Sequence, residues 1–423
     1  MTEQFQTTSA AVANGRRPAH GGTLILGGGF GGAHVARLLG RRGATVVNPD
    51  GSMLYTPLLP EVAAGAMEPR HAVVPLRMMC PHAEVVRGRA VALDEAGRTV
   101  TVETAVGRVE LAYERLVVAL GAVPRSLPIP GLAEHGLAFK RIGDAIRLRD
   151  HVLRQLDLAE ADPDNARRHL TFVFVGAGFA GVEALAELHQ LVRDAIRHYP
   201  AIRDVPQRWV LVDGGAKVLA EVPERLSDYT AALLARRAVD VRLGTRLASV
   251  EPDAMTLSDG TRIATETLVW TAGIASNPLL RDLGLPLDER GRVLVDATLK
   301  VEGRENVWAL GDCARVPNEA TPEQPDPPTC QHALRQARRL AKSLAGDARP
   351  YRYRSLGGGA TLGRDKGIAT VFGLKIRGLL GATVVRAYHV HQLPLLSRRL
   401  RVLADGTLAR FTRRDIADLG SAA

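Results

Sequence analysis

Two stretches of the chain, about 150 residues apart, share one order of apolar and polar positions. Each begins with a short apolar run and a glycine-rich turn, continues with an Ala- and Leu-rich segment, and ends in another apolar run. Short apolar runs beside glycine are typical of buried strands, and the longer segments are typical of helices. The runs and segments are 23–26, 33–42 and 44–47 in the first stretch, and 171–175, 182–196 and 209–212 in the second. We therefore predict an α/β protein with two Rossmann-like domains, the second inserted in the first.

The segments after each unit alternate in polarity, which favours antiparallel hairpins. They are 85–93, 99–102 and 108–111 in the first half, and 241–243, 248–250, 255–257 and 262–263 in the second. An apolar strand follows each set and ends in a loop of small residues that contains Gly121 or Gly273. We expect these loops to border bound nucleotides.

The glycine-rich turns both read G-x-G-x-x-G, with Gly27, Gly29 and Gly32 in the first and Gly176, Gly178 and Gly181 in the second. In this motif the first glycine makes a tight turn, the second lets backbone amides approach a pyrophosphate, and the third allows close helix packing. Two copies in the same strand–loop–helix context favour two dinucleotide sites over glycine turns without a ligand.

The residue after the second strand distinguishes the two sites. Asp213 stands there in the second unit, where an acid accepts both ribose hydroxyls and repels a 2′-phosphate, so NADH is favoured over NADPH. Lys217 nearby leaves some use of NADPH open. In the first unit Asn48 stands where the acid is expected, and it offers a carbonyl acceptor without charge. We expect weaker ribose binding at that site.

The first site is predicted to hold FAD, because a strand-like run at 306–310 ends in Gly311 and Asp312. In flavoproteins with two dinucleotide sites, this Asp contacts the ribityl and phosphate side of the flavin. A buried Asp at a strand end needs hydrogen-bond donors, which a ribityl chain supplies.

The formal charge of +10 is concentrated in one part of the chain. Residues 335–414 contain 18 Lys or Arg and three acids, so this segment carries +15 and the remaining chain −5. The distribution argues against a nucleic-acid partner and predicts one positively charged face. The three well-separated cysteines exclude a disulfide scaffold and a redox dithiol pair, and no group of residues suggests a metal site.

These residues together resemble the type II, non-proton-pumping NADH:quinone oxidoreductases, within the superfamily of flavoproteins with two dinucleotide sites. The resemblance runs from about residue 23 to residue 414. Besides the glycine loops and 311–312, it rests on four short motifs at 55–63, 181–183, 271–273 and 363–366. It implies FAD on the first loop and Asp312, NADH on the second loop and Asp213, and a quinone as electron acceptor.

Three catalytic residues follow from the resemblance. Glu183 matches a Glu that the family places near the nicotinamide, and Gln331 matches the first Gln of the family's Ala-Gln-x-Ala-x-Gln quinone motif. Lys366, at a matching basic position, is expected to orient the acceptor or to stabilise negative charge on the flavin.

The quinone motif itself is altered in this chain. Cys330 replaces its first Ala, and Arg335 replaces its second Gln. Gln336 follows directly, but on a helix it is turned by about 100° from the expected position.

The C-terminal segment 376–411 mixes apolar clusters with arginines, as amphipathic helices on a membrane surface do. The family docks on membranes through this region, and we predict docking on an anionic membrane. Four residues, Gly378, Gly381, Pro394 and Gly406, are expected to break long helices here. A helix pair that covers the flavin or forms a homodimer interface stays open as the alternative.

The predicted organisation has five parts: a disordered tail at 1–21, a first FAD-binding part at 22–150, an NADH-binding domain at 151–290, a second FAD-binding part at 291–345, and an acceptor and membrane-docking segment at 346–423. The start of the chain lacks the apolar region of a signal peptide, and no apolar run is long enough to cross a bilayer. We therefore expect a cytoplasmic enzyme, peripheral on the inner face of the cell membrane.

Two other functions stay open. A soluble NADH-dependent flavoprotein reductase that serves a ferredoxin or an oxygenase would fit the altered quinone motif. A flavin-containing redox sensor, in which NADH binding changes a protein interface, would fit the uncharged Asn48. Sulfide:quinone reductase chemistry is disfavoured, because Cys313 belongs to the Gly-Asp-Cys-Ala flavin motif.

Overall fold

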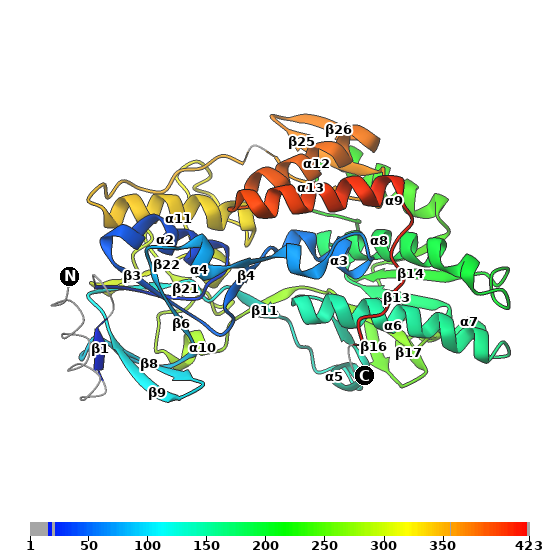
Figure 1. Ribbon diagram of the computed structural model, residues 1–423, viewed down its shortest axis with the longest axis horizontal. Helices are drawn as coiled ribbons and strands as arrows, with labels where there is room; N and C mark the ends of the chain where they lie inside the picture. Colours follow the sequence, from blue (N-terminus) through cyan, green and yellow to red (C-terminus); the bar gives the residue numbers. More distant parts are fainter. Residues whose placement is uncertain (1–15, 19–21, 356, 421–423) are drawn as a thin grey trace. The chain divides into compact units, whose positions relative to one another are not determined.

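The computed structural model describes residues 16–18, 22–355 and 357–420, and the chain forms two compact units (Figure 1). The first unit comprises Met1–Leu54, Val73–Val123 and Ala275–Arg354, and the second Tyr55–Ala72, Pro124–Ile274 and Ser355–Ala423. Within the segment predicted as a tail, β1 (Arg16–Pro18) pairs in parallel with β9 (Gly107–Ala112). The rest of that segment, 1–15 and 19–21, lies outside the described residues.

The first unit is built around a parallel sheet of five strands. Its order is β22 (Val307–Ala309), β10 (Arg115–Val118), β2 (Thr23–Leu26), β3 (Ala44–Asn48) and β6 (Glu84–Arg87). All four residues of β2 are buried, as expected for a central strand of a parallel sheet covered on both faces. Helix α2 (Phe30–Leu39) follows the glycine loop and packs against β2, β3 and α11 (Cys330–Leu344).

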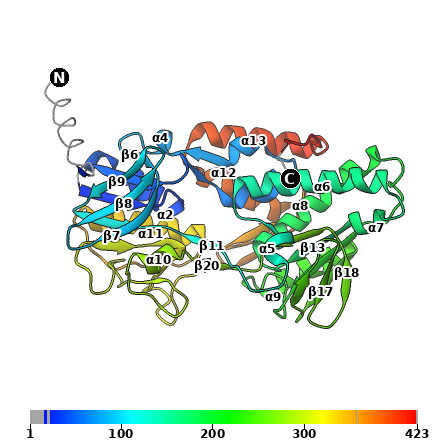
Figure 2. The same ribbon diagram turned by 90° about the horizontal axis from the view of Figure 1, so that it is seen from below.

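The predicted hairpin strand 85–93 is in fact two strands in two different sheets. Residues Glu84–Arg87 join the parallel sheet as β6, whereas β7 (Arg89–Asp94) pairs antiparallel with β8 (Thr99–Thr104), which pairs with β9 (Figure 2). The break falls at Gly88, where a Cβ would lie 2.6 Å from the carbonyl oxygen of Glu103. Arg87-Gly88-Arg89 interrupts the apolar residues on either side, but the sequence does not show that the two sides pair with different strands.

The second unit repeats the parallel architecture. Its sheet order is β12 (Leu137–Ala138), β19 (Thr267–Trp270), β13 (Thr171–Val175), β14 (Arg208–Asp213) and β15 (Val239–Leu243). Helix α8 (Phe179–Ala195) packs against β13, against α6 (Ile142–Ala161) and against α3 (Leu59–Ala63). All five strands lie between β10 and β22 in the sequence, so the predicted fold class, with its inserted second Rossmann-like domain, is confirmed.

A small antiparallel sheet contributes to the core of the second unit. It consists of β16 (Leu247–Val250), β17 (Ala254–Leu257) and β18 (Arg262–Ala264). Its apolar side chains form one buried cluster with those of the parallel sheet, whose members include Val173, Val175, Val210, Val212, Met255, Leu257 and Ile263. The alternating pattern of these short strands matches their half-buried position.

The C-terminal segment forms a three-stranded antiparallel sheet and two helices. The strands are β24 (Gly359–Thr361), β25 (Gly367–Val371) and β26 (Leu374–Arg377), and the helices are α12 (Gly378–Gln392) and α13 (Leu396–Phe411). The prediction that Gly381 and Gly406 break helices is wrong, because α12 and α13 run through them. At Gly381 a Cβ would lie 2.5 Å from the carbonyl oxygen of Gly367, so the glycine allows α12 to pack closely on β25.

The remaining elements are short except for α9. They are η2 (Gly40–Arg42), β4 (Ser52–Leu54), η3 (Thr56–Leu58), η4 (Pro69–Ala72), β5 (Val73–Pro75), α4 (Leu76–Met79), β11 (Ala122–Pro124), α5 (Leu132–His135), α7 (Ala166–His169), η5 (Ile196–His198), α9 (Glu224–Arg236), β20 (Ile274–Ser276), α10 (Leu279–Asp282), β21 (Val293–Leu294), η6 (Gly311–Cys313) and β23 (Ala314–Arg315). Among the described residues, no helix is both long and apolar enough to span a bilayer.

Candidate functional site

The residues predicted to bind FAD meet at one edge of the first parallel sheet. Gly27, Gly121 and Gly311 follow β2, β10 and β22, and Asn48 is the last residue of β3. These four strands are neighbours in the sheet and run in parallel, so their carboxyl ends share an edge. From β2 the chain continues to β3 on one side, whereas β22, the next strand of this sheet after β10, lies on the other side of β10. Ligands bind at such a switch point in open α/β sheets.

The second sheet brings its predicted residues together in the same way. Gly176 follows β13, Asp213 ends β14, and Gly273 lies just beyond β19, and these strands are again parallel neighbours. Each unit therefore has a complete nucleotide edge of its own.

The geometry of both glycine loops fits a bound pyrophosphate. A Cβ at Gly27 or Gly176 would lie within 2.7 Å of Ala119 or Thr271, so these turns need glycine to pass the neighbouring strand. By contrast, a Cβ at Gly29 or Gly178 would meet no described neighbour within 4 Å. The space that these two glycines leave lies at the N-termini of α2 and α8, where backbone amides favour an anion.

The polar residue at the end of the second strand organises each loop. In the second unit the Asp213 carboxylate accepts hydrogen bonds from the amides of Ala177 (2.7 Å) and Gly215 (2.6 Å). Each carboxylate oxygen has a further acceptor site, which a ribose hydroxyl can use.

In the first unit, both polar atoms of the Asn48 side chain form hydrogen bonds. Its Oδ1 accepts from the amide of Gly28 at 2.8 Å, and its Nδ2 donates to the carbonyl oxygen of Asp50 at 2.8 Å. The loop is thus ordered as in the second unit, but the acceptor is neutral.

The turn after β22 depends on Gln336, which the sequence did not assign to this site. Gln336 lies on α11 and is 2% exposed. Its Oε1 accepts from the amide of Gly311 at 2.8 Å, and its Nε2 donates to Asp326 at 2.9 Å. Asp312 is half-buried in the same turn. Gln336 is therefore a positioning residue of the Gly311 turn, and its amide is not free to replace the second Gln of a quinone motif.

The three residues predicted to be catalytic lie in both units. Gln331 is half-buried in the first turn of α11, in the first unit. Glu183 on α8 and Lys366 in the β24–β25 turn belong to the second unit. Glu183 is buried, whereas Lys366 is exposed to solvent.

Glu183 connects α8 to the C-terminal segment. Its Oε1 accepts from the backbone amide of Thr361 at 2.8 Å, and the hydroxyl of Thr361 lies 3.4 Å away. Burial, followed by the charge of Glu61, raises the pKa of Glu183 well above its ordinary value. Burial thus favours the protonated form of Glu183.

Two further buried acids, which the sequence did not single out, lie beside Glu183. Burial and the charge of Glu187 raise the pKa of Glu61 to about 7. Glu187 itself is fully buried and forms ion pairs with Arg414 and, at 3.8 Å, with Arg386. The sequence signal for this cluster is the spacing of Glu183 and Glu187, one helical turn apart in the part of α8 before His189, which is otherwise apolar.

Among the described residues, Cys80, Cys313 and Cys330 form no disulfide, and the first two are buried. Burial raises the pKa values of Cys80 and Cys313 to about 11, which suppresses the reactive thiolate. These two buried thiols are therefore unsuited to disulfide exchange.

The two nucleotide edges define a protein that binds two dinucleotides, and comparison with known proteins agrees. The family model described as pyridine nucleotide-disulphide oxidoreductase matches residues 22–337. The type II NADH:quinone oxidoreductase NdhA of Mycobacterium tuberculosis is 30% identical over 389 residues, which cover 87% of this chain and 83% of that protein. The chain belongs to the pyridine nucleotide-disulphide oxidoreductases and, among them, to the type II NADH:quinone oxidoreductases.

Two more comparisons extend this result. The type II NADH:quinone oxidoreductase Ndh of the same organism is 29% identical over 418 residues, covering 92% of this chain and 88% of that protein. The solved structure of NDH2 from Plasmodium falciparum in complex with NADH has the same fold, with a TM-score of 0.87 at 17% identity over 93% of this chain and 99% of that one. The predicted family and enzyme class, an NADH dehydrogenase with FAD and NADH as cofactors, are confirmed.

Gln336→Ala should weaken FAD retention, because it removes the side-chain acceptor of the Gly311 amide and one of the hydrogen-bond donors of buried Asp326. Losing a hydrogen bond to a buried charged group costs about 1.5–3 kcal/mol. If that loss disorders the Gly311 turn, the affinity for FAD should fall roughly tenfold or more. The measurement is the FAD dissociation constant of refolded or flavin-stripped protein. Gln331→Ala on the same helix is the control and should keep its flavin; equal retention in both variants would contradict the role of Gln336.

Glu61→Gln and Glu187→Gln should change stability in opposite directions. Because the pKa of Glu61 is raised, the contribution of its protonated side chain to the free energy of unfolding is present below pH 4.5 and is lost as the pH rises to about 7. Glu61→Gln should therefore be more stable than the parent at pH 8, by at most about 3 kcal/mol, and equally stable near pH 4.5.

Glu187→Gln leaves Arg414 poorly paired in the interior, so the free energy of unfolding should fall by about 3 kcal/mol or more. Urea denaturation at both pH values tests the pair, and a pH-independent effect of Glu61→Gln would refute its raised pKa.

Proposed function

We propose that this chain oxidises NADH through FAD and passes the two electrons to a membrane quinone. The observation that carries the proposal is the pair of matching nucleotide edges, one in each unit of a chain whose relatives are NADH:quinone oxidoreductases.

The first unit is proposed to hold FAD. Gly27, Gly29 and Gly32 would receive its pyrophosphate at the N-terminus of α2, and Gly121, Gly311 and Asp312 would border the rest of the molecule. Asn48 would accept a hydrogen bond from the ribose without the charge of an acid. A flavin site that lacks this charge is expected to bind FAD less tightly than one with Asp or Glu.

The second unit is proposed to hold NADH, with Gly176, Gly178 and Gly181 at its pyrophosphate and Gly273 beside it. Asp213 would accept the ribose hydroxyls while its loop contacts keep the carboxylate in place. A 2′-phosphate would face this carboxylate, which favours NADH over NADPH.

When bound, FAD supplies the redox chemistry, which is acceptance of a hydride from NADH and return of two electrons to the quinone. The chain supplies binding, orientation and protons. Glu183, whose pKa burial raises well above its ordinary value, would lie near the nicotinamide within the buried acid cluster. Gln331 would donate a hydrogen bond to a quinone carbonyl, and Lys366 would orient the acceptor.

Purified protein should show a flavin absorbance spectrum. NADH should bleach this absorbance in the absence of oxygen, and a water-soluble quinone should restore it.

Asp213→Ala should raise the KM for NADH about tenfold or more, because two ribose hydrogen bonds to a charged acceptor are lost, and should raise the KM for NADPH less. Asp164→Ala, at an exposed position in the same unit, is the control. A colourless protein that takes up no FAD, or an Asp213→Ala variant with an unchanged KM for NADH, would refute the assignment.

We further propose that α12, α13 and the β25–β26 turn dock on an anionic membrane at the cytoplasmic face of the cell membrane. Large apolar side chains of these elements are exposed, among them Phe372, Leu374, Leu379, Leu380, Leu396, Leu400, Leu403, Leu408 and Phe411. Exposed cations accompany them, namely Lys375, Arg377, Arg401, Arg410 and Arg413. Apolar side chains beside cations match a lipid surface with negative headgroups, and the cytoplasmic leaflet carries such lipids.

The inner side of α13 keeps this face in place. Val402 is buried, and Asp405 pairs with His71 at 2.5 Å and accepts from the amide of Glu68. Leu396, Leu400 and Leu403 follow at helical spacing on the exposed side.

Leu400→Ser combined with Leu403→Ser should reduce sedimentation with phosphatidylglycerol vesicles and leave turnover of a water-soluble quinone unchanged. Burial of each leucine in lipid contributes about 1.5–3 kcal/mol, so binding should fall at least tenfold. The control combines Val106→Ser and Leu158→Ser, which replace exposed apolar residues elsewhere. If the parent protein does not sediment with the vesicles but the double variant changes a dimer into a monomer, the face is a homodimer interface instead.

A further inference from the structure

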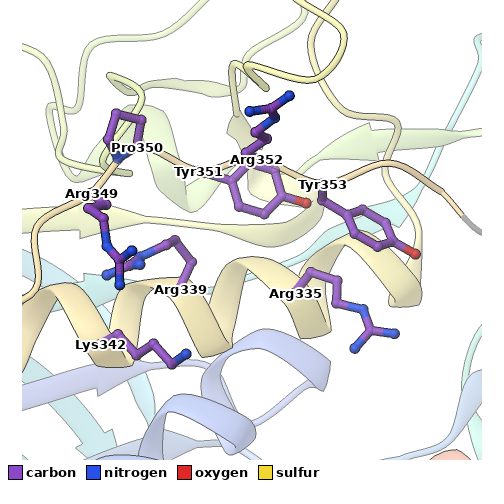
Figure 3. A pocket seen from close by; sticks show the side chains of 8 residues that line it. All are labelled: Arg335, Arg339, Lys342, Arg349, Pro350, Tyr351, Arg352 and Tyr353. Atoms are coloured by element: carbon purple, nitrogen blue, oxygen red, sulfur yellow. The ribbon is translucent and has the colours of Figure 1, made fainter.

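A basic surface pocket of about 370 Å³ lies in the first unit, between α11 and the segment that follows it (Figure 3). Eight residues line it: Arg335, Arg339, Lys342, Arg349, Pro350, Tyr351, Arg352 and Tyr353. None of them belongs to the nucleotide edges or to the catalytic residues discussed above.

The pocket contains far more positive than negative charge. Five of its eight lining residues are cations, and Asp347 is the one acid among the described residues that forms ion pairs with them. Arg349 holds Asp347 with two hydrogen bonds of 2.7 and 2.8 Å, and Arg339 approaches the same carboxylate at 3.3 Å. The hydrogen bonds from Arg349 lower the pKa of Asp347 to about 2.

Three cations of the pocket have no ion pair within the described part of the chain. Lys342 and Arg352 are exposed, and Arg335 lies over the ring of Tyr353, 5.4 Å from its centroid. Arg335, Arg339 and Lys342 are spaced four and three residues apart, so they share one face of α11. Like charges at this spacing destabilise a helix unless a counter-charge is present.

The wall opposite α11 is held in place by backbone bonds. The amide of Tyr351 donates to the carbonyl oxygen of Ala297 at 2.7 Å, and the amide of Glu319 donates to the carbonyl oxygen of Tyr351. Tyr351 is 1% exposed. In Figure 3 Arg339 from the helix and Arg349 from this wall point toward each other. The cations are thus presented by two fixed elements rather than by a loose tail.

We propose that this pocket binds an anion with two or more linked phosphate groups. Guanidinium groups bind phosphate oxygens in pairs, and a lysine adds a compact charge. From Arg335 to Lys342 the helix rises about 10 Å, so a single phosphate cannot contact all of the cations, whereas a diphosphate can reach most of them. The phosphates can come from a soluble diphosphate or from a lipid headgroup such as cardiolipin. The proposal does not depend on the redox function.

The test uses the FAD-bound enzyme with saturating NAD⁺, so that both dinucleotide sites are filled. Inorganic pyrophosphate is titrated by calorimetry into the parent protein and into Lys342→Gln combined with Arg352→Gln. These side chains are exposed and unpaired, so the variant should fold, which its flavin content and melting temperature verify. The matched control is Arg338→Gln combined with Arg354→Gln, which removes two exposed arginines from the same helix and segment outside the pocket.

Binding of one pyrophosphate that weakens at least tenfold in the pocket variant, and less than about twofold in the control, supports the proposal with a soluble ligand. The second arm sediments the same proteins with phosphatidylcholine vesicles with and without cardiolipin. Cardiolipin-dependent sedimentation that the pocket variant loses and the control keeps supports a lipid headgroup as the source. Equal losses in both variants, or no binding in either arm that depends on Lys342 and Arg352, would overturn the proposal.

Discussion

The second unit depends on a stripe of buried acids along α8 and on the arginines that meet it. Glu187 pairs with Arg414 and Arg386, and Asp194, two turns further, accepts a hydrogen bond from Arg364 at 3.0 Å. Burying charges is expensive, and the interior tolerates them only when each is paired and hydrogen-bonded. The stripe therefore requires the C-terminal segment to return to α8, the same helix whose N-terminus is proposed to receive the pyrophosphate of NADH. It also uses three of the segment's arginines, Arg364, Arg386 and Arg414, as partners of these acids, so part of the basic charge is structural and only the remainder is available to a membrane.

The two proposed nucleotide edges share one local arrangement. Asp213 and Asn48 occupy equivalent positions and each accepts a hydrogen bond from the second residue of its glycine loop. The loop can thus be ordered by either side chain, since only an acceptor oxygen is needed. Asp213 and Asn48 are expected to differ in how strongly they bind a ribose. A charged carboxylate is a stronger acceptor for ribose hydroxyls than a neutral amide, and the Asn48 amide nitrogen already donates to the carbonyl oxygen of Asp50.

Helix α11 combines two roles that its sequence does not separate. Its buried side carries Gln336, which links the Gly311 turn to Asp326, while Arg335, Arg339 and Lys342 face the basic pocket. From the sequence alone Gln336 looked like a displaced member of a quinone motif. The helical period places it correctly in the interior, but its partners, Gly311 and Asp326, lie 25 and 10 residues earlier in the chain, and only folding brings them near. Lys366, by comparison, is exposed in the structure, and its role in catalysis stays a prediction.

The sequence by itself determined the two strand–loop–helix units, the residues at their carboxyl edges and the family, because glycine loops and strand-end acids act through local backbone geometry. It also located the basic charge, which is a matter of composition. Only the tertiary structure decided that 84–94 divides between two sheets at Gly88, that α12 and α13 pass through Gly381 and Gly406, and that residues 55–72 belong with the second unit. It alone placed Glu61 beside Glu183 and Glu187 and turned part of the C-terminal charge inward. Those outcomes depend on contacts between residues far apart in the chain, and such contacts leave no periodic pattern in the sequence.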